Sequence, residues 1–148
     1  MKKILFLLIL LTASCGYQPI YLDTDEQKFK FSKIIIEEND EISKKLIRSM
    51  SFEENEADYT LDELSLKSTY ETSETSKNSK GQVQSYRSII FVTLKIMNKD
   101  KIIKEKNFFK EFTYNIKKNK FDLIQYQKQI QNNLVNEIAR DINIYLNI

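Results

Sequence analysis

The sequence contains no histidine and no tryptophan, and its 148 residues include only two glycines, one proline and one cysteine. Without histidine, the chain lacks the commonest general base at neutral pH and the commonest metal ligand. Two glycines are too few for a glycine-rich loop that binds phosphate. A lone cysteine has no partner for a disulfide within the chain. These absences argue against most nucleotide-binding proteins and against catalysis that depends on histidine.

Other catalytic arrangements find little support. Serine–lysine neighbours such as Ser43-Lys44 and Ser79-Lys80 stand in polar surroundings without a supporting motif. Paired carboxylates such as Glu37-Glu38 are typical of solvated surface, and no loop has the spacing of a calcium site. We therefore expect no enzyme, no catalytic residue, no metal site and no separate cofactor.

The N-terminus has the three parts of a secretory signal peptide. Two lysines follow Met1, residues 4–11 are apolar, and Thr12-Ala13-Ser14 precede Cys15. The apolar run of eight residues is far shorter than the roughly 20 that a membrane-spanning helix needs. The pattern resembles a lipobox, although Thr12 stands where leucine is usual. We predict that residues 1–14 are removed and that Cys15 carries a diacylglycerol and an N-acyl chain such as palmitate.

The residues after Cys15 indicate a membrane location and a tether. Gly16, rather than aspartate, follows the cysteine, which favours the outer membrane, with the anchor facing the periplasm. Residues 15–28 contain Pro19 and no regular period, so we expect an extended lipidated tether. Residues 29–148 are then predicted to form a single α+β domain.

Charge is unevenly distributed along a neutral mature chain. With Lys2 and Lys3 removed, 21 basic residues face 21 acidic ones. Residues 15–76 hold 15 acidic and 7 basic residues (−8), whereas residues 77–148 hold 14 basic and 6 acidic ones (+8). Overall neutrality argues against general nucleic-acid binding. Either the two halves attract each other in the fold, or a basic surface meets an acidic ligand.

Periodicity predicts a strand, a helix and three further strands. A β-branched and aromatic run spans 29–36, and Asn39-Asp40 then offer a cap for a helix with Ile42, Leu46 and Met50 on one side. Apolar residues alternate from Leu61 to about Glu71, a polar segment with Gly81 marks a hairpin, and further strands cover about 83–97 and the region up to Ile116.

The last element is the clearest. Asp122 and Gln125 have the spacing of a capping box. An apolar stripe at steps of four follows, formed by Tyr126, Ile130, Leu134, Ile138, Ile142 and Leu146. The element order β-α-β-β-β-α predicts an α+β two-layer sandwich, with a four-stranded, mostly antiparallel sheet and two helices on one face.

Two surface features point towards binding. Residues 95–120 hold nine lysines among aromatic residues. They form either a solvated face that protects an edge strand or a surface for an anionic amphiphile. Ile89, Phe91 and Phe109 fall on the sheet face that the helices should leave open. Either a partner covers that face or the strand register is misassigned there.

The segment Cys15-Gly16-Tyr17-Gln18-Pro19-Ile20-Tyr21 resembles the start of the mature lipopolysaccharide-assembly lipoproteins (the LptE family), with Ile20 in place of leucine. Gly81–Arg87 also looks like that family's hairpin exit, and the order of elements matches. The resemblance implies a plug inside the β-barrel of the translocon subunit LptD that helps the barrel assemble and assists lipopolysaccharide insertion.

The family's lipid contacts lie near two loops. Transferred by position, they imply that five lysines bind lipopolysaccharide: Lys77, Lys80, Lys117, Lys118 and Lys120. Ile89, Phe91 and Phe109 are expected to dock against the LptD barrel, because they are apolar on the face that the helices should leave open. The alternative from a different class is a lipoprotein subunit of an envelope phospholipid transporter, or a structural envelope lipoprotein.

Overall fold

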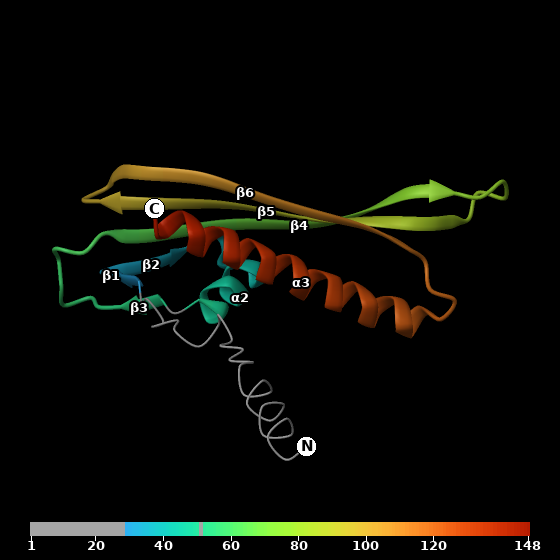
Figure 1. The fold of residues 1–148 in the computed structure, drawn as a ribbon, viewed down its shortest axis with the longest axis horizontal. Coiled ribbons are helices and arrows are strands. Elements are labelled where there is room, and N and C mark those ends of the chain that lie inside the picture. The colour runs from blue at the N-terminus through green and yellow to red at the C-terminus, as the bar shows by residue number, and fades with distance from the viewer. Residues whose placement is uncertain (1–28, 51) are drawn as a thin grey trace, which may run out of the picture.

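The computed structural model describes residues 29–50 and 52–148 (Figure 1). The predicted signal peptide, Cys15 and the tether therefore lie outside the described residues. The main sheet has the strand order β2-β4-β5-β6. Its strands are β2 (Lys33–Ile36), β4 (Glu63–Lys77), β5 (Val83–Asn98) and β6 (Lys101–Asn115). β2 runs parallel to β4, and the other two pairings are antiparallel.

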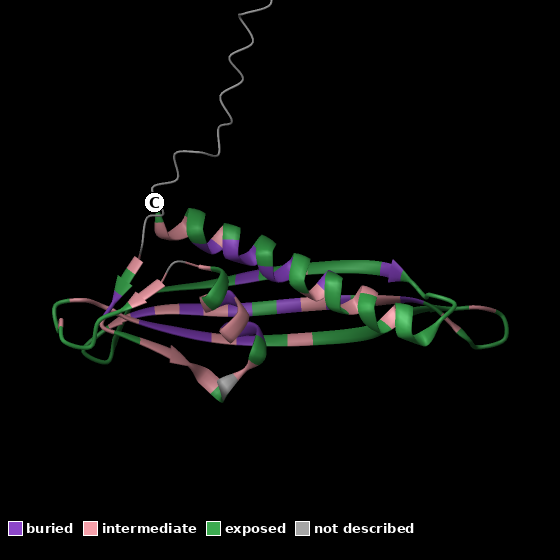
Figure 2. Ribbon diagram, turned by 90° about the horizontal axis from the view of Figure 1, so that it is seen from below, coloured by how far each residue is buried: buried purple, intermediate pink, exposed green. Residues whose placement is uncertain are grey.

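Two helices cover one face of this sheet. α2 (Glu41–Ser49) packs against β4, and α3 (Lys120–Leu146) packs against β5 and β6. Figure 1 shows the sheet as one layer and the helices as the other, and Figure 2 shows α3 on the β6 side of the sheet. The predicted α+β fold and its element order β-α-β-β-β-α are confirmed.

The core forms where alternating strand residues meet the stripe of α3. Leu66 of β4, Ile90 and Leu94 of β5, and Ile138 and Ile142 of α3 have no exposed surface. Burying each such side chain contributes about 1.5–3 kcal/mol to folding. The period-two strands and the i, i+4 stripe therefore face each other, as predicted.

The predicted first strand proves to be two strands. β1 (Phe29–Phe31) pairs in parallel with β3 (Phe52–Glu54), and only residues 33–36 join the main sheet. The chain changes sheets at Ser32, whose backbone N–H donates to the Asp62 carbonyl at 2.9 Å. Edge-to-face contacts of Phe52 with the rings of Phe29 and Phe31 hold the small sheet together. The run of β-branched and aromatic residues over 29–36 gives no sign of this division into two strands.

The hairpin between β4 and β5 is longer than predicted. β4 continues to Lys77, although residues 72–77 are polar, because β5 runs beside it as far as Val83 and supplies its backbone partners. Thr75 and Ser76 share hydrogen bonds with the Ser85 hydroxyl, at 2.7 and 2.6 Å. The turn closes as expected at Gly81, whose φ of 79° suits glycine.

The predicted cap of α3 was three residues too late. Asn119, not Asp122, precedes the helix, and its side-chain oxygen accepts from the Phe121 backbone N–H at 2.9 Å. Asn119 follows directly on the connection from β6, so the helix begins as soon as the chain turns back. Lys120 is consequently the first helical residue rather than part of a loop.

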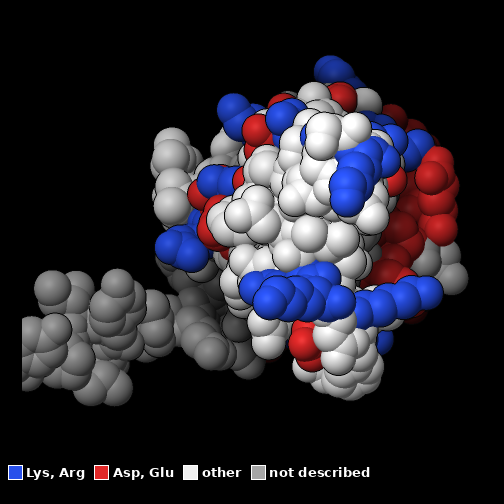
Figure 3. Space-filling model, turned by 90° about the vertical axis from the view of Figure 1, so that its right-hand side faces the viewer, with Lys and Arg blue, Asp and Glu red and all other residues white. Residues whose placement is uncertain are grey.

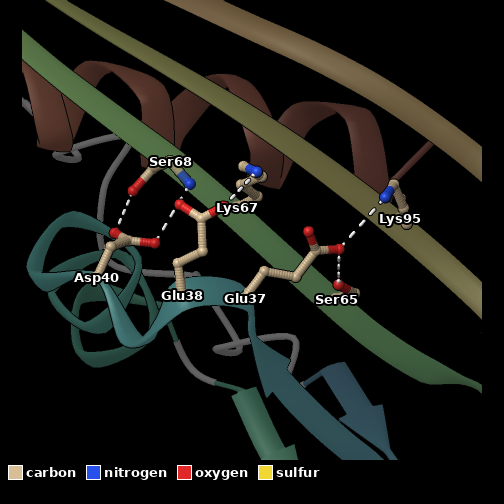
Figure 4. Close-up of polar contacts among 7 residues, drawn as sticks. All are labelled: Glu37, Glu38, Asp40, Ser65, Lys67, Ser68 and Lys95. Carbon is tan, nitrogen blue, oxygen red and sulfur yellow. Dashed lines mark hydrogen bonds and ion pairs between the residues drawn. The ribbon is translucent and has the colours of Figure 1, made fainter.

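A clamp of three acidic residues fixes the edge of the sheet (Figure 4). The short 3-10 turn η2 (Glu37–Asn39) carries Glu37 and Glu38, and Asp40 caps α2. Glu37 accepts from the Ser65 hydroxyl at 2.9 Å and from Lys95 at 3.2 Å, and Glu38 accepts from Lys67 at 2.6 Å. Asp40 instead accepts from Ser43 and Ser68, at the N-terminus of α2.

These contacts shift the ionisation of the clamp. The Ser65 hydroxyl, and then Lys95, hold the pKa of Glu37 below its usual value. Burial alone raises the pKa of Asp40, but hydrogen bonds from Ser43 and Ser68 outweigh it and leave that pKa lowered. The clamp is thus a fixed set of charged hydrogen bonds with a structural role.

Candidate functional site: a basic end and an open sheet face

The five predicted lysines lie at one end of the molecule. Lys77 is the last residue of β4, Lys80 lies in the following turn, Lys117 and Lys118 connect β6 to α3, and Lys120 begins α3. Figure 1 shows the hairpin turn and the β6–α3 connection at the same end, opposite the β5–β6 turn. Figure 3 looks onto this end and shows basic side chains in separate groups across it.

The lysines differ in whether their ammonium groups have a partner within the chain. The Lys77 ammonium lies 2.9 Å from the Glu74 carboxylate, and that of Lys117 lies 4.2 Å from the centre of the Tyr126 ring. Among residues 29–50 and 52–148, no acidic side chain forms a salt bridge with Lys80, Lys118 or Lys120. Three of the five ammonium groups are therefore available to an external anion.

Helix α3 adds to the positive potential at this end. Its N-terminus carries the positive end of the helix dipole, where cations are unfavourable and anions favourable. Lys117, Lys118 and Lys120 surround that terminus, and Asp122 is the acidic residue of the first turn. Several lysines near the positive end of the helix dipole make an environment that would stabilise an anion such as a phosphate.

The open face of the sheet carries the predicted apolar residues. Phe91 of β5 stands directly opposite Phe109 of β6, and Ile89 stands between Glu71 and Glu111. Phe91 is 41% exposed and Phe109 53%, whereas Ile89 is half-buried. Both helices lie on the other side (Figure 1), so the strand register was assigned correctly. That a partner covers these residues stays a prediction.

Sequence reasoning missed a pocket between β6 and α3. Phe112 was placed on the correct face, but it is 47% exposed, because a pocket separates it from part of α3. It lines a pocket of about 150 Å³ together with residues of α3. These are Tyr126, Gln129, Ile130, Asn133, Leu134 and Glu137. The polar row Gln129, Asn133 and Glu137 beside the apolar stripe was the available signal.

The structure offers no metal site or membrane-spanning helix in the part that it describes. No group of three or more acidic or cysteine side chains in residues 29–50 and 52–148 is placed to hold a metal ion. None of the described helices is both long and apolar enough to cross a membrane.

The fold is shared with bacterial lipoproteins of known structure. Rare lipoprotein B from Shewanella oneidensis superposes with a TM-score of 0.60 at 15% identity, over 77% of this chain and 92% of that one. A minor lipoprotein from Acinetobacter baumannii gives 0.53 at 15% identity, over 76% and 86%. Lipoprotein B from Nitrosomonas europaea gives 0.55 at 11% identity, over 88% and 94%.

Two of these neighbours are described as lipoprotein B and the third as a minor lipoprotein, and the fold that the resemblance implies is confirmed. No protein-family profile matches the sequence, and no functionally curated protein is detectably similar to it.

Proposed function

We propose that the mature chain is a lipoprotein, anchored through Cys15 in the outer membrane, that plugs LptD and assists lipopolysaccharide insertion. The observation that carries the proposal is the fold: lipoproteins of the rare lipoprotein B kind share it over most of their length. The lipobox-like sequence ending at Cys15 supports the anchor independently of the fold. Neither feature calls for catalysis, which suits a structural and carrier role.

The basic end supplies a rationale for lipopolysaccharide binding. Lipid A phosphates are anionic, and lysine is a compact donor suited to them. Lys118 and Lys120 have no acidic partner among the described residues, and they lie beside the α3 N-terminus, where an anion is favoured. Each exposed contact contributes little, about 0.5–1 kcal/mol. Binding would therefore rest on several lysines acting together.

The open sheet face supplies a rationale for docking to a barrel. It is mostly polar, with ion pairs such as Arg87–Glu111 at 3.7 Å, and Phe91 and Phe109 form an apolar centre within it. An apolar centre with a polar surround is the usual composition of a protein–protein interface. A barrel wall around the plug would cover this face.

Lipopolysaccharide binding is tested with Lys117, Lys118 and Lys120 changed together to glutamate. Binding of purified lipopolysaccharide to the full chain is measured at two salt concentrations. The matched control changes Lys33, Lys99 and Lys101 to glutamate, because these exposed lysines lie at the opposite end. We expect at least a tenfold loss for the first variant, little change for the control, and weaker wild-type binding at high salt. Equal affinities for both variants would contradict the site.

The partner is tested by purification and crosslinking. A photo-crosslinker at Phe91 should capture LptD in cells, and a large β-barrel should co-purify in a one-to-one ratio. The control is a crosslinker at Tyr59, which is 88% exposed and lies near the β5–β6 turn, where it lines a pocket with Asn98 and Lys99. Capture of a transporter component instead, or equal capture from both positions, would favour the alternative of a phospholipid-transporter subunit or a structural lipoprotein.

The anchor is tested by labelling cells with a radioactive fatty acid. Cys15→Ala should abolish the label and leave the uncleaved precursor to accumulate, because the acceptor thiol is gone. Equal label in the wild type and the variant would rule out lipid attachment at Cys15.

A further inference from the structure

The space between β6 and α3 forms a short groove with defined ends. Figure 1 shows α3 diverging from the sheet towards its own N-terminus. One end is bridged by Lys110 of β6 and Asp141 of α3, whose charged atoms lie 2.8 Å apart. Near the other end Lys117 lies over the Tyr126 ring. Between them is the pocket of about 150 Å³, with Phe112 as one wall and Ile130 and Leu134 contributing apolar surface.

The volume of the pocket limits its occupant. Sites for drug-sized ligands usually measure roughly 300–1,000 Å³, so this pocket is too small for one. A cavity of about 150 Å³ takes one benzene ring. A fatty acyl chain is several times larger than one ring. The pocket therefore fits a single aromatic or leucine side chain, whose attached backbone would lie in the open part of the groove.

β6 offers that backbone a partner. It is the last strand of the sheet, and within the described residues it pairs with β5 alone. Its outer edge presents alternate N–H and C=O groups along the fifteen residues of Lys101–Asn115. An extended peptide can add to such an edge, with hydrogen bonds giving affinity and side-chain pockets giving specificity. The amides of Gln129 and Asn133 provide further polar partners on the opposite wall.

We propose that the groove between β6 and α3 binds an extended segment of a partner polypeptide. The segment adds as a strand to β6 and inserts an aromatic or leucine side chain into the pocket beside Phe112. This surface is distinct from the open sheet face, and it adjoins the proposed lipopolysaccharide site at Lys117, which lies over the Tyr126 ring. The inference does not depend on either of those proposals.

A displayed peptide library tests the proposal. The bait is the full chain in lipid nanodiscs, and the library holds 11-residue peptides with alternate positions randomised. Asn133→Trp places an indole at the pocket, and Asn136→Trp is the matched control on the same helix, outside the pocket lining. Both asparagines are exposed, so neither change disturbs the core. Because the chain has no other tryptophan, a blue-shifted emission of Asn133→Trp reports that the indole fills the pocket.

We expect wild type and Asn136→Trp to enrich peptides with phenylalanine, tyrosine or leucine at one fixed position. Affinity for Asn133→Trp should fall at least tenfold. N-methylation of one alternate set of peptide nitrogens should abolish binding, while methylation of the other set should not, because only one set points at β6.

Several results would overturn the proposal: no enriched pattern, equal binding to Asn133→Trp, or indifference to both methylation sets. A wild-type dimer that Asn133→Trp converts to a monomer would assign the groove to a second copy of the chain instead. Protection of the pocket by dodecanoate, with no peptide enriched, would assign it to an acyl chain.

Discussion

Asp40 joins two elements of the fold through one carboxylate. It caps α2 by accepting from the Ser43 backbone N–H at 2.6 Å, and it accepts from both the backbone and the hydroxyl of Ser68 in β4. Ser43 and Ser68 also bond to each other at 3.1 Å, so the buried hydroxyls are satisfied within the group. This arrangement holds the first turn of α2 against the centre of the sheet.

We predict that Asp40→Ala lowers the free energy of unfolding by about 1–2 kcal/mol, the usual cost of losing a helix cap and a partly buried hydrogen bond. Urea denaturation at neutral pH measures this. Glu41→Ala is the control, because Glu41 lies in the same helical turn but forms only an exposed pair with Lys44 at 3.3 Å. Its effect should stay within about 0.5 kcal/mol. Equal losses for both variants would show that charge, and not capping, is what matters.

Asp40 also makes the stability of the fold depend on pH. The pKa of Asp40 is lower in the folded chain than its ordinary value because its hydrogen bonds outweigh the effect of burial. Its contribution to stability is therefore fully present above the unfolded pKa of about 3.9, and it is lost as pH falls through the lower folded value. We expect wild type to lose more stability than Asp40→Ala when urea denaturation is repeated from pH 5 down to pH 3. Parallel pH curves would contradict the shift.

At the scale of elements, regular patterns were predicted well and junctions poorly. The stripe from Ile130 to Ile142 and the alternation of Ile90, Val92 and Leu94 were assigned correctly, because burial on one face repeats along the element. The break at Ser32 and the strand β3 were missed, because they depend on pairing with distant residues rather than on local pattern. The groove beside Phe112 was missed for the same reason, since it requires the angle between α3 and β6.

The corrected start of α3 yields a test at the same scale. Asn119→Ala should cost about 1 kcal/mol of stability, with little dependence on salt, because the lost interaction is a cap hydrogen bond. Asp122→Ala should cost about 0.3–1 kcal/mol at low salt and less at high salt, because Asp122 acts only through the helix dipole. Urea denaturation at two salt concentrations separates the two. A larger, salt-independent loss for Asp122→Ala would restore the capping box first predicted from the sequence.

At the scale of the whole molecule, the sheet has one face that the helices cover and one that they leave open. The helices cover the first, and the second combines ion pairs with the apolar centre of Phe91 and Phe109. These residues were correctly predicted to lie on the open face. In β5 and β6 the alternation of apolar and polar residues is long enough to show which side chains point to which face of the sheet. The sequence pattern does not indicate whether a partner covers them, because a partner surface leaves no periodic signal in the chain that it binds.

The separation of the two faces predicts that contact can be removed without loss of the fold. Phe91→Ser combined with Phe109→Ser should change the free energy of unfolding by no more than about 1 kcal/mol, because cross-strand pairs on an exposed face contribute only roughly 0.2–1 kcal/mol. Co-purification of the outer-membrane partner should nevertheless fall several-fold, because apolar residues at the centre of an interface carry much of its binding energy.

The control for this variant is the next row of the same face. Thr93 and Asn107 stand opposite each other one row away, joined by a hydrogen bond of 2.9 Å, and both are changed to alanine. Stability is measured by urea denaturation, and the partner is quantified after affinity purification from solubilised membranes. If the two double variants retain the partner equally, the phenylalanines are ordinary exposed residues. If the phenylalanine variant unfolds, then this face belongs to the core, and the division of the sheet into a folding face and a contact face is wrong.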